Sequence, residues 1–111
     1  MQWIDSLLTE CDLEEKNVLL LCHFPVFPKS AANLWNDEEI VALLEQHSSV
    51  KAFINGHHHP GNYALKNGIH YLTLQGMVYS EKENAFSIGI LESSKIRIKG
   101  FGREPNRTLN F

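Results

Sequence analysis

Two apolar segments decide the fold of this chain, and both end in histidine: Val18-Leu-Leu-Leu-Cys-His23 and Val50-Lys-Ala-Phe-Ile-Asn-Gly-His-His-His59. A continuous apolar run of strand length is typical of a strand that is covered on both faces. Between the two segments, Asn36 or Asp37 can cap a helix that runs to about His47. The order strand, helix, strand predicts a parallel crossover.

Regular elements are also predicted on both sides of this crossover. Apolar residues at helical spacing predict a helix over residues 3–11. Lys66-Asn67-Gly68 and Glu92-Ser93-Ser94 each separate two strand-like segments, which predicts two hairpins. We expect the tail, residues 100–111, to be irregular. The sequence therefore predicts one α/β domain over residues 1–111, with a mixed β-sheet that carries helices on one face.

Composition excludes several classes of protein. The chain has 111 residues and a formal net charge of -3, and its basic residues form no stripe, so no nucleic-acid partner is predicted. No apolar run approaches the roughly 20 residues that span a bilayer, so no membrane partner is predicted. Two cysteines, Cys11 and Cys22, are too few for a disulfide framework. We therefore expect a reducing, cytoplasmic location.

The candidate chemistry lies just after the two apolar strands. His23 and the run from His57 to His59 follow the carboxyl ends of neighbouring strands, where open α/β sheets place their sites. If the run is extended, His57 and His59 face one cavity and His58 faces away. Gly56 would let the backbone bend close to a bound ion. Because neutral imidazole is the commonest metal ligand, this arrangement predicts a metal site.

Other histidines and the cysteine beside His23 have plainer interpretations. His47 is expected to be structural, near the C-terminus of its helix. His70 is expected to be a partly exposed strand residue. Cys22 and His23 could form a nucleophile–base pair, but adjacent strand residues point to opposite faces, so we expect them not to meet.

Two motifs resemble those of the calcineurin-like metallophosphoesterases. Leu21-Cys22-His23-Phe24-Pro25-Val26 resembles the fourth motif, a single histidine, and Asn55-Gly56-His57-His58-His59 resembles the fifth, G-H-x-H. Four further stretches are similar to the manganese-dependent ADP-ribose/CDP-alcohol diphosphatase branch: Leu34-Trp35-Asn36, Gly56 to Tyr63, His70 to Gly76, and Gly100-Phe101-Gly102-Arg103.

The resemblance implies a fold, a set of metal ligands and a reaction. The chain would be half of a four-layer αββα sandwich. His23 and His57 would bind one divalent ion and His59 the other; Asn55, Gly56 and His58 would lie near the site. The ions would be manganese, iron or zinc. The substrate would be a phosphorylated small molecule or nucleotide, hydrolysed at a phosphodiester or diphosphate bond.

The sequence departs from the family pattern at three motifs. It contains no D-x-H, G-D-x-x-D or G-N-H-[DE], so the aspartate and asparagine ligands and the candidate general acid are missing. Asp5, Asp12 and Asp37 lack the expected neighbours. We therefore expect the C-terminal portion of a metallophosphoesterase, inactive alone, with no catalytic residue assigned in this chain.

Two alternatives stay open at this point. One is a non-catalytic metal-binding module in which His23, His57 and His59 hold a single ion. The other concerns assembly: half of a sandwich exposes an apolar sheet face and a strand edge, so self-association through that sheet is expected if the chain is isolated.

Overall fold

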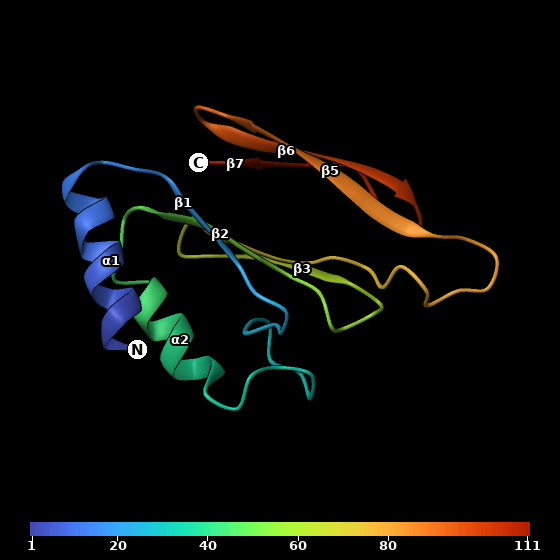
Figure 1. Ribbon diagram of the computed structural model, residues 1–111, viewed down its shortest axis with the longest axis horizontal. Helices are drawn as coiled ribbons and strands as arrows, with labels where there is room; N and C mark the ends of the chain where they lie inside the picture. Colours follow the sequence, from blue (N-terminus) through green and yellow to red (C-terminus); the bar gives the residue numbers. More distant parts are fainter.

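The structure is a computed structural model that describes residues 1–111. Two helices cover one face of a four-stranded sheet, and a three-stranded sheet covers its other face (Figure 1). The elements are α1 Gln2–Leu13, β1 Val18–Leu21, α2 Asp37–Leu44, β2 Val50–Asn55, β3 Asn62–Lys66, β4 Ile69–Thr73, β5 Ala85–Glu92, β6 Lys95–Gly102 and β7 Arg107–Asn110.

The first sheet has the strand order β1-β2-β4-β3, and the second has the order β5-β6-β7. β1, β2 and β4 are parallel, while β3 pairs antiparallel with β4. The α/β class, the mixed sheet and the helices on one face are confirmed. The chain contributes both sheets, however, rather than the single sheet expected from the resemblance. No helix is long and apolar enough to cross a membrane.

Side chains that alternate along the strands fill two cores. On the helix side, Leu8 of α1 and Leu44 of α2 pack with Phe53 and Tyr71. Between the sheets, Leu72 of β4 packs with a second group of buried side chains. A strand buried on both faces must be apolar throughout. The second core comprises Ala52, Leu72, Ile96, Ile98 and Leu109.

Two predictions about the C-terminal half are wrong. The tail is not irregular, because β6 extends to Gly102 and β7 pairs with it antiparallel. Only Leu109 of β7 is buried, so the strand has almost no apolar signal. His70 is buried rather than partly exposed: its Nδ1 lies 2.9 Å from Tyr63 Oη, and its Nε2 lies 2.7 Å from the carbonyl oxygen of Asn110. It therefore connects the two sheets.

His47 joins α1 to the loop before β2, as its predicted structural role requires. The predicted helix stops at Leu44, short of this residue. The Nδ1 atom of His47 lies 2.7 Å from Asp12 Oδ2, and its Nε2 atom lies 3.1 Å from Asp5 Oδ1. Asp12 also accepts a hydrogen bond of 2.7 Å from the backbone N–H of Ser49. The carboxylates of Asp5 and Asp12 therefore have structural roles in this fold.

The Asp12 carboxylate should make stability depend on pH. Burial raises its pKa, but hydrogen bonds from Ser49 and His47 outweigh burial and lower the pKa from 3.8 to about 2. A lowered folded pKa stabilises the fold above the unfolded value, and this contribution disappears as the pH falls from about 4 to about 2. We expect Asp12→Asn to lose up to about 2 kcal/mol of unfolding free energy at about pH 6.

Urea unfolding of both proteins at a series of pH values measures this effect. The difference between wild type and Asp12→Asn should shrink toward zero near pH 2. A difference that stays constant over the whole range would contradict the assignment to the carboxylate.

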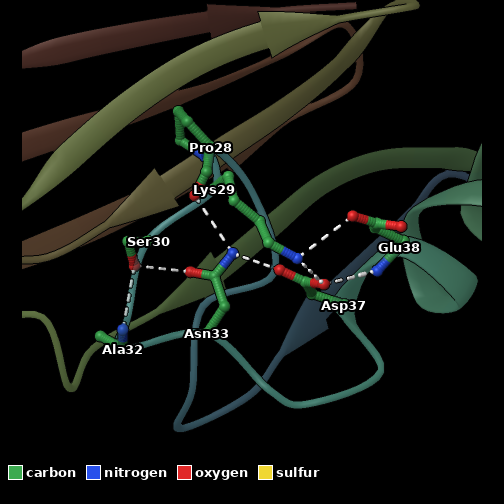
Figure 2. A network of polar contacts seen from close by, with 7 residues as sticks. All are labelled: Pro28, Lys29, Ser30, Ala32, Asn33, Asp37 and Glu38. Carbon is green, nitrogen blue, oxygen red and sulfur yellow. Dashed lines mark hydrogen bonds and ion pairs between the residues drawn. The ribbon is translucent and has the colours of Figure 1, made fainter.

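A polar network fixes the loop between β1 and α2, which begins at His23. The buried carboxylate of Asp37 accepts hydrogen bonds from Lys29 Nζ at 2.9 Å and from Asn33 Nδ2 at 2.7 Å (Figure 2). Asn33 also donates to the carbonyl oxygen of Pro28 at 3.2 Å. Burial raises the pKa of Asp37, but these two donors outweigh it and lower the pKa. Asp37 therefore orders this loop within the fold.

Candidate metal centre

Two of the predicted ligands meet where β1 and β2 end. The Nε2 atom of His23 and the Nδ1 atom of His57 lie 3.1 Å apart, although 34 positions separate the residues. The backbone N–H of Gly56 donates to the carbonyl oxygen of His23 at 3.1 Å, which ties the two loops together. The parallel pairing of β1 with β2 places both loops at the same sheet edge.

The distance between these nitrogens fits two ligands of one metal ion. With metal–nitrogen bonds of about 2.0–2.1 Å and ligand angles of about 90–110°, two imidazole nitrogens lie about 2.8–3.4 Å apart. Both histidines are exposed, so an ion can reach them. The ring of Phe24 lies 4.8 Å from that of His23 and 4.4 Å from that of His57, which limits how the imidazoles can turn. Imidazole donors suit transition-metal ions such as zinc and iron.

His59 contacts a different set of residues. Its ring contacts Tyr79, with the ring centroids 5.9 Å apart, and its carbonyl oxygen accepts a hydrogen bond from Gly76 at 2.9 Å. No group of three or more His, Cys, Asp or Glu side chains could hold a metal ion. The structure thus pairs His23 with His57 and does not bring His59 into a three-ligand group with them, and the ligand roles themselves stay predictions.

The loop is a turn rather than the extended segment that we expected. His57 adopts a left-handed backbone conformation with φ of 65°, and Gly61 N–H donates to the carbonyl oxygen of His58 at 2.9 Å. Gly56, in contrast, has no crowded neighbour, since a side chain there would meet only His23 O at 4.0 Å. The alternation of an extended segment, on which the prediction for His57 and His59 depended, therefore does not apply to this loop.

The remaining residues predicted near the site support the loop. Asn55 is buried, and its Nδ2 atom donates to Thr73 Oγ1 at 2.9 Å and to the carbonyl oxygen of Gly56 at 2.9 Å. Asn55 therefore fixes the end of β2 against β4. His58 is half-buried. Sequence reasoning overlooked Gly76 and Arg103 as neighbours of His59, because their contacts depend on loops far apart in sequence.

Comparison with known proteins gives consistent relatives. No protein-family model matches the chain. Proteins named manganese-dependent ADP-ribose/CDP-alcohol diphosphatase align with all of it: that of Xenopus laevis is 34% identical, and that of Homo sapiens 28%. The chain spans only 33% and 34% of these two relatives, about a third of their length.

A solved structure agrees with this relationship. The crystal structure of a dimetal phosphatase from Danio rerio matches 99% of this chain with a TM-score of 0.94 and 33% sequence identity, and the match covers 37% of that protein. Sequence and fold therefore agree over the whole of this chain. We conclude that it is homologous to a segment, about one third in length, of the manganese-dependent ADP-ribose/CDP-alcohol diphosphatases.

Proposed function

We propose that this chain supplies part of the metal centre of a hydrolase that cleaves phosphodiester or nucleotide diphosphate bonds. One observation carries the proposal: His23 and His57 lie 3.1 Å apart at adjacent strand ends of a fold that matches a dimetal phosphatase. In this proposal His23 and His57 hold one divalent ion, and His59 contributes to a second. The names of the relatives make nucleotide diphosphate compounds the first substrates to test.

The chain's own residues have limited roles in this reaction. Bound divalent ions would activate a water molecule and neutralise charge on the phosphoryl oxygens. The three imidazoles would bind and orient these ions, and the left-handed turn at His57 sets the backbone from which His57 and His59 project. Neutral imidazoles bring no negative charge to balance two divalent ions. We therefore propose that the chain alone binds metal but does not turn over substrate.

Activity assays test this proposal directly. The chain alone, with manganese, should give no detectable hydrolysis of ADP-ribose or of an aryl phosphodiester. A hybrid in which this chain replaces the matching segment of the Danio rerio dimetal phosphatase should hydrolyse at least one of them in a manganese-dependent manner. A well-folded hybrid that hydrolyses neither would contradict the proposal.

The alternative, a non-catalytic module that is stabilised by a single metal ion, predicts a different response to chelation. Structural zinc sites normally have four protein ligands, and no group of three is present here. If a single ion staples the fold, chelation should strongly destabilise it. We expect a chelator to change the unfolding midpoint of this chain only slightly.

We also propose that the isolated chain self-associates through its open sheet edges. β1 pairs only with β2, and β5 pairs only with β6. Near these edges Leu21 is 79% exposed and Leu91 is 68% exposed. Both edges lie on the same side, since Asn17 before β1 donates to the carbonyl oxygen of Ser93 in the turn after β5. Unpaired edges and apolar patches promote association.

Sedimentation velocity over a range of concentrations measures this association. Wild type should form dimers or larger species, whereas a Leu21→Lys, Leu91→Lys double variant should need at least about tenfold higher concentration to do so, because lysine on an edge opposes pairing. A Lys51→Arg variant is the matched control. A wild-type chain that stays monomeric throughout would refute this proposal.

A further inference from the structure

The strand-end loop that follows β4 lies between the histidine loop and the C-terminal end of β6. Gln75 N–H donates to Glu104 Oε2 at 2.8 Å, and Gln75 Nε2 donates to the carbonyl oxygen of Arg103 at 2.9 Å. The side chain of Glu104 is only 1% exposed. Hydrogen bonds to Arg103 and Glu104, which follow β6, therefore fix the position of Gln75, the residue before Gly76.

Gly76 sets the position of the His59 ring. A Cβ atom on Gly76 would lie 2.7 Å from Cγ of His59 and 2.9 Å from both its Cβ and Cδ2 atoms. Such distances are too short for non-bonded carbon atoms, so the imidazole can lie where it does only because residue 76 has no side chain. The backbone hydrogen bond of 2.9 Å from Gly76 N–H to His59 O fixes the two segments together.

Arg103 holds Gly76 in turn. Its Nη2 atom donates to the carbonyl oxygen of Gly76 at 2.6 Å, and its Nη1 atom donates to Gln75 Oε1 at 3.1 Å. The guanidinium also lies over the ring of Tyr79, 5.5 Å from its centroid, and the edge of that ring meets His59. Arg103 thus contacts two residues, Gly76 and Tyr79, that each lie against the His59 ring.

We propose that Arg103 is a positioning residue that fixes the His59 imidazole for a metal ion by clamping Gly76 and Tyr79. This inference rests on the proposed function, in which His59 is a ligand. Groups that orient a ligating histidine typically change metal affinity by about 10–100-fold when they are mutated. The planar guanidinium donates in two directions while it stacks on an aromatic ring, which lysine cannot reproduce.

The test uses the full chain with Zn²⁺ as the probe. Zn²⁺ is diamagnetic and shifts the NMR signals of an imidazole when it binds that ring, so the ring signals of His57 and His59 report on ions bound at each. We expect Arg103→Lys and Gly76→Ala to raise the Zn²⁺ concentration needed to shift the His59 signals by about tenfold or more. The concentration that shifts the His57 signals should stay within about twofold.

Arg97→Lys is the matched control, because Arg97 lies on β6, the strand that Arg103 directly follows, and its side chain bonds only Glu92. It should leave both titrations unchanged, and urea unfolding should show that Arg103→Lys stays folded. If Arg103 had only a structural role, its substitution would weaken ion binding at both rings or at neither. Either of these results would overturn the proposal.

His59→Ala separates this inference from the function on which it rests. In wild type, failure of Zn²⁺ to shift the His59 signals at all would refute the ligand role, and the inference would fall with it. If wild-type His59 binds and His59→Ala weakens total Zn²⁺ binding, but Arg103→Lys and Gly76→Ala titrate as wild type, the ligand role survives and only the positioning role of Arg103 is refuted.

Discussion

His57→Ala should lower the manganese-dependent kcat of the Danio rerio hybrid by at least about 100-fold. The variant removes one of the two nitrogens that lie 3.1 Å apart, and it leaves His23 to bind the ion alone. Even groups that only orient a metal ligand cost about 10–100-fold when they are lost, so a ligand should cost no less. Steady-state hydrolysis of ADP-ribose at saturating manganese measures the effect.

His58→Ala is the matched control for this prediction. His58 is adjacent in sequence and carries the same imidazole, but it is half-buried, and its backbone forms the turn by bonding Gly56 and Gly61. Its variant should keep kcat within about threefold of the unmutated hybrid. If His57→Ala and His58→Ala lose activity equally, the loop matters only for folding and the assignment of His57 as a ligand is wrong.

Leu72→Ala should have the largest effect on stability. Leu72 is fully buried between the two sheets, with Ala52, Ile96, Ile98 and Leu109 around it. Truncating such a leucine removes its transfer free energy and leaves a cavity, which together cost about 2–5 kcal/mol. We expect a loss of this size from the free energy of unfolding, measured by urea denaturation with circular dichroism.

Leu65→Ala is the control, because Leu65 lies on the neighbouring strand β3 but is 59% exposed. Substitutions at exposed positions usually change stability by less than about 0.5 kcal/mol. Similar losses for the two variants would show that the second sheet contributes little to the fold. A large loss for Leu72→Ala alone would show that packing between the two sheets stabilises the fold.

The parts of the fold that could be predicted are those with strong local signals. The apolar run that begins at Val50 predicted strand β2, and Asn67-Gly68 predicted the first hairpin. β7 escaped prediction because it buries only Leu109, and an edge strand with polar residues on both sides of that leucine resembles a loop. The buried state of His70 was hidden for a related reason: its partner in the second sheet is Asn110, 40 positions away.

The candidate site was predictable in composition but not in geometry. The motif spacing indicated His23, His57 and His59, yet the left-handed turn at His57 has no sequence signal, since glycine is the residue usually found there. The contacts of Arg103 with Gly76 connect two loops 27 positions apart. Such pairings depend on how the sheets pack, which a single sequence does not specify.

The contacts of two buried histidines also simplify any spectroscopic study of ion uptake. Both ring nitrogens of His47 lie within hydrogen-bonding distance of carboxylate oxygens, and those of His70 lie near Tyr63 Oη and Asn110 O. Neither imidazole can turn a ring nitrogen toward a cation without losing one of these contacts. Their resonances can therefore serve as silent internal references, against which movement in the other four histidines is read.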